Sequence, residues 1–77
     1  MRKPKRQVPT ELDALLTEEE AAQLIGFSKR TLQAWRYAKI GPPFVLAGRS
    51  VRYRRGTLLD WVSENTQHPA IRQQLVS

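Results

Sequence analysis

Two helical patterns joined by three residues are the feature that most constrains how this chain can fold. The first pattern ends at Gly26, and glycine stops a helix because it adopts a positive φ without strain. The second begins after Ser28, whose hydroxyl oxygen suits the N-cap of a helix. A connection this short sets the two helices at a steep angle, which is the helix-turn-helix arrangement. Phe27 lies inside the connection and is expected to fill the angle between the helices.

The first helix is predicted over residues 18–25. Thr17 and Glu20 have the spacing of a capping box, in which the hydroxyl of Thr17 and the carboxylate of Glu20 each accept the other residue's backbone N–H. Carboxylates in the first turn also interact favourably with the positive end of the helix dipole. The buried stripe of this helix is expected to consist of Ala21, Ala22, Leu24 and Ile25.

The second helix is predicted over residues 29–39, with Leu32 and Trp35 facing the core. Part of Tyr37 or Ala38 is expected to join them. The opposite face of this helix is polar and cationic, and carries Lys29, Arg30, Gln33 and Arg36, with Thr31 beside them.

A β-hairpin is predicted over residues 44–54, because Gly41-Pro42-Pro43 ends helical structure before it. Its turn is expected at residues 48–50. The second strand alternates in character, which directs Val51 and Tyr53 inward and the two arginines that follow them outward.

A third helix is predicted over residues 57–65, with Gly56 or Thr57 as its N-cap. Its apolar residues are Leu58, Leu59, Trp61 and Val62. The order helix, helix, hairpin, helix indicates an α+β fold that is mostly α.

Three regions are expected along the chain. Residues 1–11 hold four cations and few apolar side chains, which predicts a basic disordered arm. Residues 12–66 form the folded domain, onto which Leu12, Leu15 and Leu16 are expected to pack. Residues 67–77 form a tail that is either a short terminal helix or frayed chain.

Composition excludes several functional classes. The chain has 77 residues and no cysteine, so it forms no disulfide and no Cys-ligated zinc site. His68 is its single histidine and follows no pattern of catalytic partners. No apolar run reaches the roughly 20 residues that a membrane-spanning helix needs. We therefore expect a cytoplasmic binding protein, not an enzyme, with no cofactor, metal, membrane or small-molecule ligand.

Charge is concentrated in one part of the sequence. The net charge is +6, yet residues 28–55 carry eight lysines and arginines and no acid. A local field this strong favours a polyanion such as DNA as the partner. A solvated basic face that keeps a small protein soluble is the alternative.

The cationic block places its side chains on two predicted elements. An α-helix fits the major groove of DNA, and its first turns reach base edges and phosphates. The hairpin could reach the minor groove or the backbone. The candidate DNA-binding residues are Ser28, Lys29, Arg30, Thr31, Gln33 and Arg36 on the helix, and Arg49, Ser50, Arg52 and Arg54 on the hairpin.

Each candidate set has a structural alternative. The helical residues could form an ordinary polar face, and Arg52 and Arg54 could protect an edge strand by their charge. The aromatic residues Trp35, Tyr53 and Trp61 are assigned to the core, although they could be taken for stacking platforms for single-stranded nucleic acid.

Residues 15–62 resemble the excisionase-like, MerR-related family of winged helix-turn-helix proteins. The matching segments are "LLTEEEAAQLIGFSKRTLQAWR", "GPPFV", "GRSVRYRR" and the closing "LLDWV". Gly56 departs from the pattern, because members of the family usually place Ser or Asp at the cap of the last helix.

The resemblance implies a winged helix-turn-helix in which the second helix reads the major groove and the hairpin wing contacts the minor groove or backbone. It also implies a bacterial, nucleoid-associated protein of a phage, plasmid or integrative element. The favoured function is that of an excisionase, which binds adjacent sites cooperatively by head-to-tail self-association, bends the DNA and biases a tyrosine recombinase (integrase) toward excision. An AlpA-like transcription regulator is the first alternative, and a protein-binding module is the second.

Overall fold

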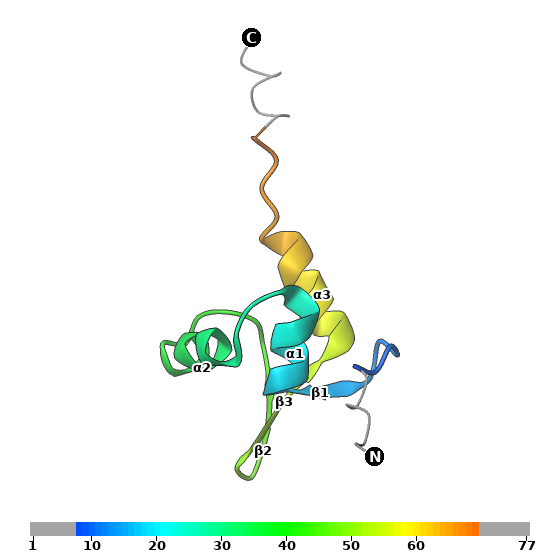
Figure 1. Ribbon diagram of the computed structural model, residues 1–77, viewed down its shortest axis with the longest axis vertical. Coiled ribbons are helices and arrows are strands. Elements are labelled where there is room, and N and C mark those ends of the chain that lie inside the picture. Colours follow the sequence, from blue (N-terminus) through cyan, green and yellow to red (C-terminus); the bar gives the residue numbers. More distant parts are fainter. Residues whose placement is uncertain (1–7, 70–77) are drawn as a thin grey trace, which may run out of the picture.

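The computed structural model describes residues 8–69, in which three helices pack with a three-stranded antiparallel sheet (Figure 1). This architecture confirms the α+β winged helix-turn-helix class. The elements follow one another as β1 (Leu15–Thr17), α1 (Glu18–Ile25), α2 (Lys29–Tyr37), β2 (Val45–Ala47), β3 (Ser50–Arg54) and α3 (Arg55–Glu64).

Helix α1 has the bounds that the sequence predicts. Its capping box is present: the N–H of Thr17 donates to Oε1 of Glu20 over 2.9 Å, and the N–H of Glu20 donates to Oγ1 of Thr17 over 3.1 Å. Gly26 ends the helix with a φ of 83°, and its N–H donates to the carbonyl of Ala22. The local sequence alone therefore determines both ends of this helix.

Helix α2 ends at Tyr37, two residues before the predicted end. Lys39 takes a φ of 62°, and the N–H of Ile40 folds back to the carbonyl of Trp35 over 2.9 Å, so the chain leaves the helix at this point. Tyr37 is 76% exposed and Ala38 is also exposed, so the expectation that one of them joins the core is wrong.

The predicted hairpin is present, but strand β1 was not predicted. The strand order is β1-β3-β2, with Leu16 opposite Tyr53 and Leu46 opposite Val51. The turn consists of residues 48–49 alone, because Ser50 already pairs with Ala47. Strand β1 has three residues and no alternating pattern, and its partner lies more than 30 residues away. Local sequence carries no signal for such a strand.

Helix α3 begins at Arg55, earlier than predicted, and neither Gly56 nor Thr57 is its cap. The N-cap is Arg54, which makes no side-chain cap hydrogen bond. Backbone carbonyls replace the cap: the N–H of Arg55 donates to Ala14, and that of Gly56 donates to Leu12 over 2.8 Å. A Cβ at position 56 would lie 3.2 Å from the Leu12 carbonyl oxygen, which explains why glycine suits this position.

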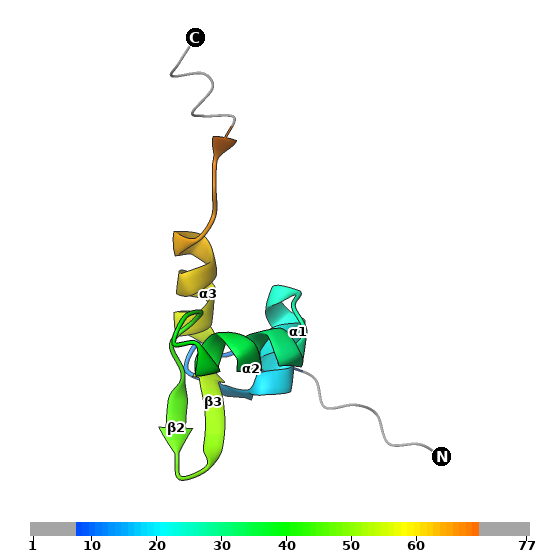
Figure 2. The same cartoon turned by 90° about the vertical axis from the view of Figure 1, so that its left-hand side faces the viewer.

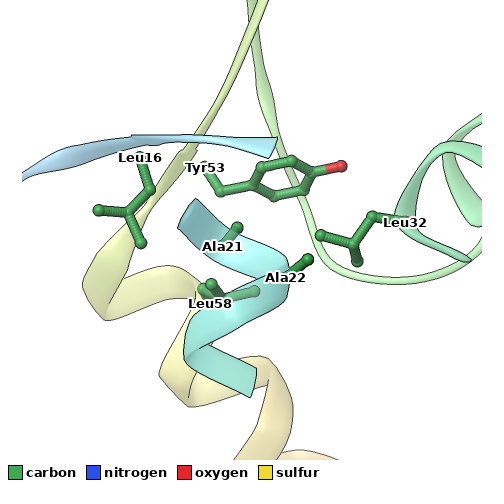
Figure 3. Packing of buried hydrophobic residues seen from close by; sticks show 6 residues of the cluster. All are labelled: Leu16, Ala21, Ala22, Leu32, Tyr53 and Leu58. Atoms are coloured by element: carbon green, nitrogen blue, oxygen red, sulfur yellow. The ribbon is translucent and has the colours of Figure 1, made fainter. Parts of the chain in front are cut away.

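The core lies between α1, α2, α3 and the inner face of the sheet (Figure 3). Trp35 packs against this core while half-buried, and Trp61 is half-buried with its ring centroid 5.6 Å from that of Trp35. Phe27 does not fill the angle between α1 and α2, because it is 50% exposed and contacts the edge of Trp35. The buried hydrophobic residues of the core are Leu16, Ala21, Ala22, Leu32, Tyr53 and Leu58.

The ends of the chain are described only in part. Val8 packs against the core, and Nη1 of Arg55 donates to the carbonyl of Pro9 over 3.5 Å, so this part of the predicted arm contacts the domain. Of the three leucines expected to pack, Leu16 is buried, whereas Leu12 and Leu15 are exposed. Residues 1–7 of the predicted arm and residues 70–77 of the predicted tail lie outside the described part of the chain.

Candidate nucleic-acid interface

Helix α2 turns two neighbouring stripes of side chains away from the core. Residues three or four positions apart lie on the same side of a helix, so Lys29, Gln33 and Arg36 form one stripe. Arg30, Ala34 and Tyr37 form the next, and all three are exposed. Ala34 and Tyr37 are not among the candidates predicted from the sequence, because Ala34 carries no polar signal and Tyr37 is one of the two residues expected to join the core.

The start of α2 is held by two hydroxyl groups. Oγ of Ser28 accepts the N–H of Thr31 over 3.0 Å, and it lies 2.9 Å from the hydroxyl oxygen of Thr31. Both hydroxyls therefore have partners within the helix start. The cap leaves exposed backbone N–H groups at the helix N-terminus, where an anion is favoured.

The β2–β3 hairpin, residues 45–54, forms a wing that projects beside α2 (Figure 2). Arg49 and Ser50 are exposed at its tip. Arg52 is half-buried, and its Nη1 donates to the carbonyl of the adjacent Val51 over 2.8 Å. This intrastrand bond holds the arginine stem along the wing.

An open groove of about 490 Å³ separates α2 from the wing, and we refer to it as the interface groove. Cationic side chains line both of its walls, which suits a negatively charged ligand. The start of α1 forms its floor, and the sequence predicts only a capping role for the acids of this helix start. The lining residues are Lys29, Gln33 and Arg36 from α2, Arg49, Ser50, Val51 and Arg52 from the wing, and Thr17, Glu18 and Glu19 from the floor.

Arg36 differs from its expected state. It was placed among exposed residues of the outer face, yet its side chain is only 17% exposed and pairs with Glu18. Its Nε donates to Oε2 of Glu18 over 3.0 Å, and its Nη2 donates to Oε1 over 3.2 Å. Local sequence gives no sign of this pair, because its members lie 18 positions apart.

Arg54 is not brought together with the other candidates. Its Nη1 donates to the backbone carbonyl of Asp13 over 3.3 Å and lies 4.0 Å from a carboxylate oxygen of the same residue. It borders a separate depression of about 180 Å³, whose other lining residues are Pro43, Phe44, Val45 and Thr57.

A helix-turn-helix beside a β-wing, with a cationic groove between them, defines a DNA-binding protein of the winged helix-turn-helix class. A family model described as a helix-turn-helix domain matches residues 15–66, which is more than half of the chain. The protein belongs to this family of small excisionase-like and AlpA-like DNA-binding proteins. No curated protein matches the chain. Within residues 8–69, no helix has the length and apolar character needed to cross a membrane.

Proposed function

We propose that this protein recognises a specific sequence in double-stranded DNA, with α2 in the major groove and the wing on the adjacent backbone or in the minor groove. The interface groove is the observation that carries the proposal. Cationic side chains from two separate elements converge on it, and the width of an α-helix matches that of the major groove.

Base recognition is assigned to the exposed side of α2. Arg30 has the length and the planar donor groups to contact a guanine, and Gln33 has the paired donor and acceptor that suit adenine. Lys29 supplies a phosphate contact at the groove wall. Ser28 and Thr31 hold the helix start, where backbone N–H groups meet a phosphate.

Backbone positioning is assigned to the wing. Arg49 and Ser50 lie exposed at its tip, and Arg52 lines the groove on the side opposite Lys29. Such contacts fix the register of a protein on the duplex without reading sequence. The wing therefore contributes affinity that depends on salt, whereas α2 contributes discrimination among sequences.

Selection from a random pool of DNA duplexes tests the proposal. The wild-type protein is expected to enrich a common sequence and to retain that duplex in a mobility-shift titration. Arg30→Ala is expected to weaken specific binding by about 1–3 kcal/mol and to relax the preference at one base pair. Failure of the wild type to retain any duplex at low salt contradicts DNA binding. Retention without an enriched sequence contradicts specificity.

For the biological role, we propose an excisionase that acts in the cytoplasm on nucleoid DNA of a mobile element. Membership in a family of excisionase-like and AlpA-like proteins supports this role. A single short recognition helix offers few base contacts, so adjacent copies bound head to tail would gain affinity through effective concentration. The proposed protein partner is a tyrosine recombinase, whose reaction the bent DNA would bias toward excision.

An excision assay separates this role from that of an AlpA-like regulator. The recombinase is expressed from an unrelated promoter, and excised junctions are counted with and without this protein. An excisionase increases the number of junctions under these conditions. A regulator leaves it unchanged and instead alters a reporter placed behind a promoter that contains the selected sequence.

A further inference from the structure

The carboxylate of Glu18 lies at the junction of the three elements that build the interface. Glu18 is only 7% exposed, in the first turn of α1. It accepts two hydrogen bonds from Arg36 on α2 and one from the hydroxyl of Tyr53 on β3, the last over 2.8 Å. Figure 3 shows the Tyr53 ring extending from β3 past α1, with its hydroxyl on the side toward α2. We call Glu18, Arg36 and Tyr53 the junction network.

The junction network connects α2 to the wing through α1. Helix α2 packs on α1, and β3 also packs on α1. Glu18 belongs to the element that both of them contact. Its Oε2 accepts hydrogen bonds from Nε of Arg36 and from the hydroxyl of Tyr53, and its Oε1 accepts one from Nη2 of Arg36. A buried carboxylate is stable only when such partners satisfy it, so the three side chains occupy one joint arrangement.

Arg36 is held from several directions. Besides the two hydrogen bonds to Glu18, its guanidinium carbon lies 4.9 Å from the ring centroid of Tyr37 and 5.9 Å from that of Phe44. The planar guanidinium forms a fork of two hydrogen bonds with the two oxygens of a carboxylate, whereas a lysine ammonium has no equivalent geometry. Its charge is balanced by Glu18, so a DNA phosphate would compete with an existing partner.

We propose that Arg36 and Glu18 are positioning residues, which set the place of α2 relative to the wing across the interface groove and do not themselves bind phosphate. This inference rests on the proposed DNA-binding function. The span between Lys29 on one wall and Arg52 on the other must match the spacing of groups on the duplex. Because the junction network fixes this span, it determines how well the protein fits its specific DNA site. It does not add to the attraction of the protein for DNA of any sequence.

Salt dependence distinguishes positioning from contact. Each protein–phosphate contact contributes about 0.9 to the slope of log affinity against log salt. Arg36→Lys keeps the charge and loses the fork. The positioning role predicts that this variant loses affinity for the selected duplex about tenfold, a loss that is usual when coupled residues in one network are changed. It also predicts that the salt slope and the affinity for unrelated duplexes do not change. Near wild-type affinity of this variant would overturn the positioning role, because lysine also binds phosphate.

A charge-balanced double variant provides the second test. Glu18→Gln combined with Arg36→Gln removes one negative and one positive charge, so the net charge equals that of the wild type. Positioning predicts that Glu18→Gln weakens specific binding and that the double variant is no weaker than Arg36→Gln. A direct phosphate contact predicts that Glu18→Gln strengthens binding by releasing Arg36.

Lys29→Gln is the matched control for a groove side chain outside the network, and its slope is expected to fall by about 0.9. Thermal melting of each variant confirms that it is folded before binding is compared.

Tyr53→Phe removes one hydrogen-bond donor to Glu18 and keeps the ion pair between Glu18 and Arg36. It is expected to lower specific affinity less than Arg36→Lys does, and an equal or greater loss would overturn the proposal. If the wild-type protein binds no duplex, the proposed function is wrong. If the wild type and Arg36→Lys bind the selected duplex equally well, only the positioning role is wrong.

Discussion

Glu18 acquires its main role from residues far away in the sequence. Its position in the first turn of α1 indicates a favourable interaction with the helix dipole, and this is all that local sequence can give. In the folded protein its partners are Arg36 and Tyr53, which lie 18 and 35 positions away. The alternation of β3 predicted that Tyr53 points inward, but not what its hydroxyl would bind.

The stability of the fold at acidic and at alkaline pH tests whether the junction network stabilises the protein. Burial by itself raises the pKa of Glu18, but hydrogen bonds from Arg36 and Tyr53 and the charge of Arg36 outweigh it, so the pKa lies below its ordinary value of 4.5. Burial, together with the hydrogen bond to Glu18, raises the pKa of Tyr53 well above its ordinary value of 10.0. Glu18 therefore stabilises the fold above pH 4.5, and Tyr53 does so below pH 10.0.

We expect the free energy of unfolding to fall at both ends of this range. The contribution of Glu18 is lost as the pH falls through its lowered pKa, and that of Tyr53 is lost as the pH rises from 10.0 toward its raised pKa. Urea denaturation across pH measures both losses. Tyr53→Phe should flatten the alkaline loss and Glu18→Gln the acidic one. If the free energy of unfolding falls equally at alkaline pH in the wild type and in Tyr53→Phe, the alkaline loss does not come from Tyr53.

At the scale of elements, helix ends that depend on local chemistry were predicted and the others were not. The capping box and Gly26 gave both ends of α1. The end of α2 depends on how the chain folds back onto Trp35, and the start of α3 depends on backbone carbonyls supplied by residues 12–14. Strand β1 exists only because β3 offers it a partner. The start of α3 and strand β1 need tertiary contacts, which no short window of sequence contains. The end of α2 is closed within residues 35–40, but Lys39 takes the positive φ there, and lysine gives no signal for that conformation.

Two glycines that follow helices give a matched prediction. Gly26 and Gly41 have nearly the same φ, 83° and 86°, but a Cβ at Gly26 meets no atom within 4 Å, whereas one at Gly41 would lie 2.8 Å from Cβ of Trp35. Gly26→Ala should therefore cost about 1–2 kcal/mol for the left-handed backbone alone. Gly41→Ala should cost about 1–3 kcal/mol more, because Trp35 must move.

Urea denaturation of the two glycine variants checks this difference. A common slope against urea concentration is needed for the comparison, since a change in slope indicates a change in the denatured state. Equal destabilisation by the two substitutions would show that the contact between Gly41 and Trp35 does not constrain the loop after α2.

At the scale of the whole molecule, the charge of the sequence overstates the charge available to DNA. Residues 28–55 carry eight cations and no acid, which predicts that this part of the chain faces a polyanion. Folding brings Glu18 and Asp13, both outside this block, against Arg36 and Arg54. Arg55 points to the carbonyl of Pro9. The sequence counts these three arginines as available charge, because their partners come from before the block.

Arg52 and Arg54 provide the final prediction, since they are two positions apart on β3 and the sequence treats them alike. Arg52 lines the interface groove, whereas Arg54 contacts Asp13 and borders the separate depression. Arg52→Ala should reduce the salt slope of duplex binding by about 0.9 and lower affinity on all sequences alike. Arg54→Ala should change the slope by less than about 0.3, because a charge away from the duplex is largely screened. Fluorescence anisotropy titrations of a labelled duplex between low and physiological salt measure both slopes. Equal slopes for the two variants would mean that the duplex extends over the depression as well as the groove, and the wing would then need a different orientation on DNA.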